Sequence, residues 1–173
     1  LMRSSAASDV YKRQIYMFDK DRSSIVTFLY VFLNILFVMA IIVLIFIPAL
    51  FFNFDYTNHV VRHIAIAEIN SIVILLVIYE LKGITGRIEE RKVFTQDNAV
   101  SFKRVSIYTF LLGIFYMVND MLNGEFHILF AFNKDGSMKI DVVVFIVLGC
   151  VFLVISQVLA KAVEIKSEND LTI

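Results

Sequence analysis

Glu68 is the residue best placed to do chemistry, because it lies inside an apolar stretch long enough to cross a membrane. An ionisable side chain costs about 2.5–3.5 kcal/mol there on insertion scales, so it is a functional candidate by default. Two amides in apolar stretches complete the set of intramembrane polar candidates, which is Glu68, Asn70 and Asn34. In the structural alternative, Glu68 sits near the outer headgroups and pairs with Arg62 or His63, while the amides join helices by hydrogen bonds.

A second group of polar residues has the spacing of a metal site. Asp55, His59 and His63 are four residues apart, which would align them on one face of a continuous helix. Asp55 falls in a polar connector, so interfacial polar residues are the better interpretation and we expect no metal site. The sequence contains no HExxH, no GxSxG, no phosphate-binding glycine-rich loop and no cysteine with a nearby histidine. We therefore expect neither an enzyme nor a cofactor.

The elements that carry these residues are four apolar stretches. Of 173 residues, 59% are hydrophobic and only 18% are charged, against roughly 25% charged in soluble domains, and the mean hydropathy is +0.78. Backbone groups must be paired within a membrane, and these stretches are too long for barrel strands. The predicted fold is an all-α integral membrane four-helix bundle, with helices at about 25–52, 62–81, 103–122 and 141–163 and a short tail at 164–173.

The amino end requires separate treatment. Residues 1–14, LMRSSAASDVYKRQ, look like translated sequencing-adaptor sequence, and we leave them out of fold reasoning. Residues 15–173 are predicted to form a single transmembrane domain, with Met17 as a candidate native start. The apolar run from Ile25 to Phe52 exceeds the hydrophobic region of a cleavable signal, so we expect it to remain as a crossing. Cys150, the single cysteine, excludes an internal disulfide framework.

Basic residues orient the predicted bundle. Outside residues 1–14, ten Lys or Arg residues fall on the side of the two termini and the middle loop, and three fall on the other side. The positive-inside rule therefore places both termini and the middle loop in the cytoplasm. That loop, Lys82 to Ser101, is expected to be either an amphipathic segment on the membrane surface or a solvated basic turn. Its cations would attract anionic lipid or would serve topology alone. On the opposite side, Asp135-Gly136 favours a hairpin over an irregular loop.

Two segments resemble a known family. One is the carboxyl-terminal ENDLTI; the other is Phe94-Thr95-Gln96-Asp97-Asn98, followed by the Phe102-Lys103-Arg104-Val105 lead into the third helix. Together with the helix order, they resemble the bacterial membrane-protein family called domain of unknown function 2975, over roughly residues 25–173. The resemblance implies a small protein of the bacterial inner membrane, often encoded beside a small helix-turn-helix regulator. It implies no particular activity.

These observations favour a regulatory or interaction protein that presents its middle loop and tail to a cytoplasmic partner, such as that regulator. The alternative is a small transporter or channel subunit whose oligomers use the intramembrane polar candidates. Besides the lipid bilayer, we consider a regulator protein and further copies of the chain as partners, and expect no direct binding of nucleic acid. The middle-loop candidates are Phe94, Asn98, Lys103 and Arg104, and the tail candidates are Glu168, Asn169, Asp170, Leu171, Thr172 and Ile173. A flexible polar tail is the alternative for the second group.

Overall fold

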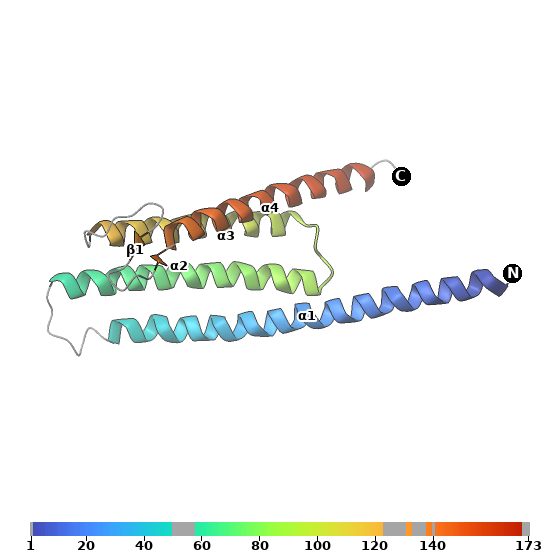
Figure 1. Cartoon of the computed structure of the whole chain (residues 1–173), viewed down its shortest axis with the longest axis horizontal. Coiled ribbons are helices and arrows are strands. Elements are labelled where there is room, and N and C mark those ends of the chain that lie inside the picture. Colours follow the sequence, from blue (N-terminus) through green and yellow to red (C-terminus); the bar gives the residue numbers. More distant parts are fainter. Residues whose placement is uncertain (1, 50–57, 123–130, 133–137, 140, 171–173) are drawn as a thin grey trace.

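The part of the chain that the structure describes forms four long helices and one short hairpin. The computed structural model describes residues 2–49, 58–122, 131–132, 138–139 and 141–170. The helices are α1 Met2–Ala49, α2 Asn58–Glu89, α3 Gln96–Leu122 and α4 Asp141–Asp170 (Figure 1). Each contains a segment long and apolar enough to cross a membrane, namely Ser24–Ala49, Val60–Glu89, Gln96–Leu122 and Val142–Asn169. The predicted all-α four-helix membrane fold is thereby confirmed.

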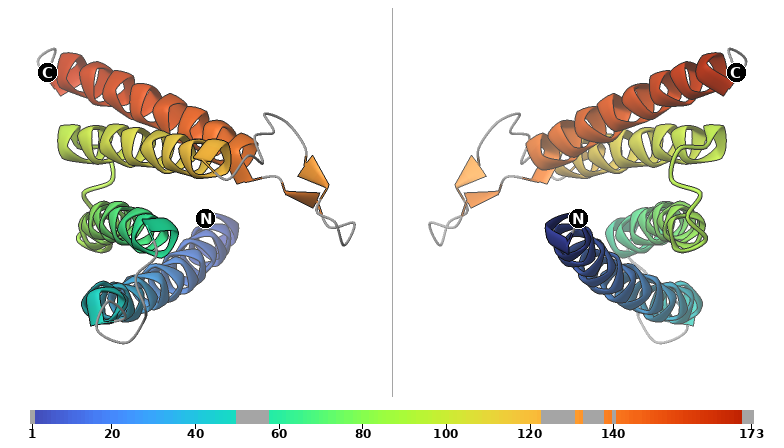
Figure 2. Two further views of the ribbon diagram at one scale, coloured as in Figure 1. Left: turned by 90° about the vertical axis from the view of Figure 1, so that its left-hand side faces the viewer. Right: turned by 90° about the vertical axis from the view of Figure 1, so that its right-hand side faces the viewer.

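The helices pack in the order of the chain. Contacts join α1 to α2, α2 to α3 and α3 to α4, and Figure 2 shows α1 and α4 at the two ends of this row. Both termini and the connector between α2 and α3 lie at the same end of the molecule, which we call the connector end (Figure 1). This agrees with the predicted grouping of the termini and the middle loop. The cytoplasmic assignment of that end rests on the charge count.

Many large apolar side chains of the described residues are exposed and few are fully buried, which is the burial pattern of a protein whose solvent is lipid. Phe28, Phe46 and Val158 are 71%, 66% and 62% exposed. Small polar residues form part of the contact between α3 and α4. Ser106 Oγ donates a hydrogen bond to the carbonyl oxygen of Gly149 at 2.8 Å, and Ser156 Oγ donates one to that of Ala99 at 2.7 Å. Small side chains let the two backbones approach closely.

Gly149 is a point of close approach in this contact. A Cβ atom at this position would lie 2.7–2.9 Å from ring atoms of Phe110. We therefore expect Gly149→Ala to lower the free energy of unfolding by about 2 kcal/mol, the cost of overpacking a close contact. Unfolding would be followed by circular dichroism as SDS is added to protein in a mild detergent. The adjacent exposed Cys150 provides the control. A Gly149→Ala variant as stable as Cys150→Ala would show that α3 and α4 can move apart by the width of a methyl group at little cost.

Three predicted helix boundaries are wrong in the same direction. α2 continues to Glu89, α3 begins at Gln96, and α4 continues to Asp170. The predicted loop from Lys82 to Ser101 is thereby reduced to a connector of residues 90–95, so it is neither an amphipathic surface segment nor a long turn. Charged residues end an apolar run without ending a helix, because Lys, Arg and Glu are strong helix formers. The structure also extends α1 to Met2, through the segment that was left out of the prediction.

The hairpin lies at the opposite end from the connector. Strand β1 (Ala131–Phe132) pairs antiparallel with β2 (Met138–Lys139), with Ala131 opposite Lys139. This pairing supports the hairpin over the irregular loop. The predicted turn at Asp135-Gly136 lies outside the described residues.

Candidate functional site

Helix α2 ends in a backbone motif that normally uses glycine. The amide of Lys92 donates to the carbonyl oxygen of Arg87 at 2.8 Å, and the amide of Arg91 donates to that of Ile88 at 3.0 Å. These are the two hydrogen bonds of a Schellman motif. Arg91 has a φ of 63°, a left-handed conformation that L side chains adopt at a cost. The surrounding contacts therefore hold the connector in a conformation that arginine does not prefer.

Helix α3 begins immediately after the connector with Thr95 as its N-cap. The amide of Asn98 donates to the carbonyl oxygen of Thr95 at 3.2 Å and approaches its hydroxyl at 3.4 Å. Asp97 places a negative charge in the first turn, where the helix dipole favours it. The sequence thus contains a local start signal for α3 at Thr95 and Asp97, whereas the motif that ends α2 has Arg91 in place of the glycine that would be a local stop signal.

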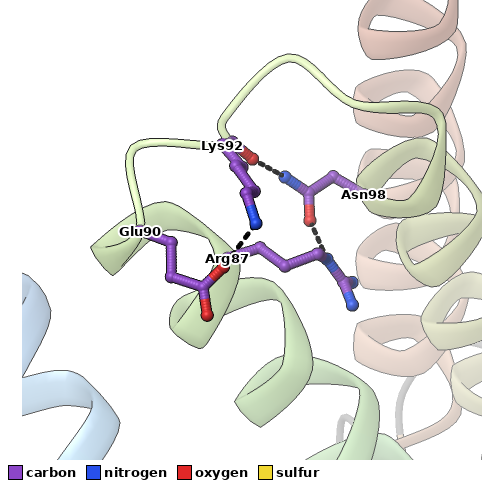
Figure 3. Close-up of polar contacts among 4 residues, drawn as sticks. All are labelled: Arg87, Glu90, Lys92 and Asn98. Atoms are coloured by element: carbon purple, nitrogen blue, oxygen red, sulfur yellow. Dashed lines mark hydrogen bonds and ion pairs between the residues drawn. The ribbon is translucent and has the colours of Figure 1, made fainter.

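Asn98 joins the two helices and the connector (Figure 3). Its side chain is 2% exposed. Its Oδ1 accepts a hydrogen bond from Arg87 Nε at 2.6 Å, and its Nδ2 donates to the carbonyl oxygens of Lys92 and Val93 at 2.9 and 2.8 Å. Arg87 Nη2 also donates to Ser101 Oγ at 2.7 Å. We call Arg87, Asn98 and Ser101 the polar lock, since they fix the connector against both helices.

The outer side of the connector carries an exposed ion pair. Lys92 Nζ lies 2.9 Å from Glu90 Oε2 (Figure 3). The hydrogen bond from Lys92, helped by its charge, lowers the pKa of the Glu90 carboxyl. The same contact raises the pKa of Lys92. Both groups therefore remain charged over a wider pH range and neutralise each other at the surface.

A second ion pair links α2 to α3 farther from the connector. Arg104 Nη1 donates to Glu80 Oε1 at 3.1 Å. The two partners differ in environment, because the Glu80 side chain is 9% exposed whereas that of Arg104 is 56% exposed. The arginine therefore compensates a buried carboxylate while its own remaining donors reach solvent or headgroups.

An open cleft of about 480 Å³ lies beside these contacts, between α1, α2 and α3. We call it the polar cleft. Tyr30 of α1 forms one wall, and Tyr79, Gly83 and Gly86 of α2 line it as well. Its charged lining residues are three cations and three carboxylates, namely Lys82, Arg87, Arg104, Glu80, Glu90 and Asp97. The volume falls within the usual range of small-molecule sites, about 300–1,000 Å³.

The intramembrane candidates do not converge on one site. Glu68 Oε2 and Asn70 Oδ1 are buried without a hydrogen-bond partner among the described residues, and so is Arg62 Nε. The predicted pairing of Glu68 with Arg62 therefore does not involve Glu68 Oε2 or Arg62 Nε. Asn34 Nδ2 donates to the carbonyl oxygen of Tyr30 within its own helix at 2.8 Å.

Asn34 is also far from Glu68 along the bundle. Thr27 of α1 donates a hydrogen bond to Glu89 of α2, and Phe37 of α1 contacts Lys82 of α2. Asn34 lies between Thr27 and Phe37 along α1. It is therefore level with the part of α2 between Lys82 and Glu89. Glu68 precedes that segment by about 14 residues, or about 20 Å at 1.5 Å per residue. A single polar path through all three candidates is not formed within the chain.

The middle-loop candidates divide into buried and exposed residues. Asn98 is buried in the polar lock and Arg104 holds Glu80, whereas Phe94 is 55% exposed and Lys103 is exposed too. Glu168 and Asn169 are exposed on the last turn of α4, which Asp170 ends. Leu171, Thr172 and Ile173 lie outside the described residues.

The spacing of Asp55, His59 and His63 cannot be followed fully in the structure. Asp55 and the side chain of His59 lie outside the described residues. Within the part of the chain that the structure describes, no group of three or more His, Cys, Asp or Glu side chains is placed to hold a metal ion.

Sequence reasoning missed Glu80, Ser101 and Tyr30, and it counted Arg87 only as a topological charge. A signal for Glu80 was available, because it is a carboxylate next to the end of the second apolar run. Its partner, 24 residues away, could not be read from local spacing. Ser101 and Tyr30 carry no local signal.

The fold and the site describe a multi-pass membrane protein whose polar contacts gather at one end. A family described as "Protein of unknown function (DUF2975)" matches residues 53–173, which is well over half of the chain. The protein belongs to this family, as the resemblance in its connector and tail predicted. The match covers α2 to α4 and begins after α1, so it is narrower than the predicted range of 25–173. No curated protein and no solved structure matches the chain.

Proposed function

We propose that this protein is a regulatory or interaction protein of the bacterial inner membrane, whose connector end faces the cytoplasm and binds a soluble partner. A small helix-turn-helix regulator is the partner that we propose, on the family resemblance described above. The observation that carries the proposal is the length of α4, which continues past the start of α3 as an exposed helix.

The extent of this projection follows from the packing of α4 on α3. Ser156 is level with Ala99, because its hydroxyl donates to the Ala99 carbonyl oxygen at 2.7 Å. The first residue of α3, Gln96, is therefore level with about residue 159 of α4. Residues 160–170 extend past α3 by about 15 Å at the helical rise per residue, and Figure 1 shows α4 continuing past the start of α3.

The side chains of the projection suit a soluble partner better than lipid. Residues 164–169 are all exposed, and four of them are Glu164, Lys166, Glu168 and Asn169. Lys161 Nζ pairs with Glu164 Oε2 at 2.7 Å, and such pairs support exposed helices. Ile165, 50% exposed, is an apolar contact within this polar surface. A charged, polar surface is typical of a helix in water rather than in lipid, and Ile165 is the apolar residue that a partner would contact.

The connector provides a second contact at the same end. Phe94 is 55% exposed and lies between Val93, whose carbonyl oxygen accepts a hydrogen bond from Asn98, and the Thr95 cap. An exposed aromatic ring on a held backbone is a good anchor for a partner, because little conformational freedom remains to be lost on binding.

The test is cross-linking mass spectrometry on tagged protein in its native membrane. We expect soluble regulator peptides joined to Lys103 and Lys166, and fewer of them after deletion of residues 168–173 or after Phe94→Ala. Lys139, in the hairpin at the opposite end, serves as the internal control. Cross-links of the same soluble partner to Lys139, or unchanged binding and downstream expression after the deletion, would overturn the proposal.

A transporter or channel subunit is the second candidate, and one observation favours it. Glu68 Oε2 and Asn70 Oδ1 are buried without described partners, and polar atoms in that state mark ion or substrate paths in membranes. A path through these atoms would form between copies of the chain. The test is flux in vesicles, where a conductance unchanged by Glu68→Ala and Asn70→Ala would exclude this role for both residues.

A further inference from the structure

The polar cleft opens at the depth where a membrane changes from hydrocarbon to headgroups. On α2 the apolar run ends at Leu81 and Lys82 follows it; on α3, Arg104 directly precedes the run that starts at Val105. Both cations line the cleft. Tyr30 and Tyr79 line it as well, and tyrosine is enriched at this level of membrane proteins. A ligand in the cleft would therefore lie at the level of the lipid headgroups.

The ion pairs leave the cleft with unneutralised positive charge. Glu80 is compensated by Arg104, and Glu90 is compensated by Lys92. Lys82, by contrast, lies 5.1 Å from the centre of the Phe37 ring. Among the described residues, no carboxylate pairs with Lys82.

Arg87 is the second cation of the cleft without a carboxylate. Its Nε and Nη2 donate to the neutral oxygens of Asn98 and Ser101. Within the described part of the chain its Nη1 donates to no group, although the guanidinium itself is held rigidly by the polar lock. Asp97 adds one negative charge, so the charged lining residues by themselves sum to zero. Lys92 lies outside the lining and neutralises Glu90, which leaves Lys82 and Arg87 against Asp97 and a balance of one positive charge.

Two glycines supply the space beside these cations. Gly83 and Gly86 lie one helical turn apart and both line the cleft. A Cβ atom on Gly83 would lie 3.3 Å from Arg87 Nη1, and one on Gly86 would lie 3.5 Å from the ring of Tyr30. A larger side chain at either position would occupy the cleft or displace its cation.

We propose that the polar cleft binds the phosphate group of an anionic phospholipid. Lys82 and the Nη1 group of Arg87 would contact the phosphate oxygens, because ammonium and guanidinium donors form strong charge-assisted hydrogen bonds with phosphate. The acyl chains would continue along the exposed apolar faces of the neighbouring helices, such as those carrying Phe28 and Ile107. Basic pockets between membrane helices bind headgroups in this way. Formation of this site does not require the proposed protein partner.

The test is native mass spectrometry of the delipidated protein in detergent, titrated with phosphatidylglycerol. We expect Lys82→Gln and Arg87→Gln each to weaken lipid binding about fivefold, the effect of about one basic contact near a membrane surface. Because Arg87→Gln also disturbs the polar lock, Gly86→Leu provides a variant that fills the cleft and retains every charge. Leucine is a better helix former than glycine, so we expect it to fold. We expect it to abolish tight binding.

Lys103→Gln is the matched control, since it removes a cation next to Arg104 that does not line the cleft. Equal weakening by Lys103→Gln, or full binding by Gly86→Leu, would show general attraction to the membrane surface and overturn the proposal. Inorganic phosphate and glycerol phosphate are titrated in parallel. If either displaces the lipid at equal concentration, the site takes a soluble phosphate and the assignment to lipid is overturned. Phosphatidylethanolamine binding as tightly as phosphatidylglycerol would overturn the preference for an anionic headgroup.

Discussion

Asn98→Ala is expected to lower the free energy of unfolding by about 3 kcal/mol. The truncation removes three side-chain hydrogen bonds at a position that is 2% exposed. It also leaves the carbonyl oxygens of Lys92 and Val93 and the Nε of Arg87 without this partner. The change is measured by SDS titration of the protein in a mild detergent. Hydrogen exchange should also become faster at the amides of residues 90–95, because Asn98 holds the connector in place.

Gln96→Ala is the matched control for this prediction, because Gln96 is an exposed amide in the same first turn of α3. We expect it to change stability by less than about 0.5 kcal/mol. If Asn98→Ala is as mild as Gln96→Ala, the polar lock does not hold the connector.

Arg104→Ala is expected to cost about 3 kcal/mol, because it leaves the carboxylate of Glu80 buried without its countercharge. Glu80→Gln should cost much less, about 1 kcal/mol, since the arginine that loses its partner is 56% exposed and can be solvated. The double variant should therefore be more stable than Arg104→Ala alone. A double-mutant cycle on the free energy of unfolding measures this asymmetry.

Lys103→Ala controls for the loss of a positive charge at the same level of the membrane, because Lys103 is exposed. Equal costs for Arg104→Ala and Glu80→Gln would mean that Glu80 is hydrated in the membrane, contrary to its burial in the structure. Equal costs for Arg104→Ala and Lys103→Ala would mean that the ion pair contributes nothing beyond general electrostatics.

Arg87 belongs both to the polar lock and to the polar cleft. A ligand in the cleft would therefore contact a residue that also holds the connector. Arg87 Nε and Nη2 hold Asn98 and Ser101, while Nη1 remains directed toward Gly83. A phosphate bound at Nη1 would therefore contact the same guanidinium that fixes the connector beside Phe94. All residues of the polar lock, and all residues that line the polar cleft except Tyr30, fall within residues 53–173, the part of the chain that the family matches.

The sequence by itself predicted the four crossings, because the apolar length needed to span a membrane is a local property that about 20 consecutive residues reveal. It also predicted the family, from the connector motif and the tail, and it grouped the termini and the middle loop at one end. Among the site residues it singled out Asn98 and Arg104, although without their partners. The helix ends were harder to predict, since charge stops an apolar run but not a helix.

Only the tertiary structure decided which polar groups meet. The pairing of Arg104 with Glu80, the burial of Asn98 against Arg87, and the separation of Asn34 from Glu68 all depend on the rotation and axial register of neighbouring helices. Those quantities are determined where helices touch, for example where Ser106 and Ser156 bond across to α4 and α3 backbones. Apolarity on every face of a membrane helix shows that it lies in lipid or protein, but it does not show which face meets which neighbour.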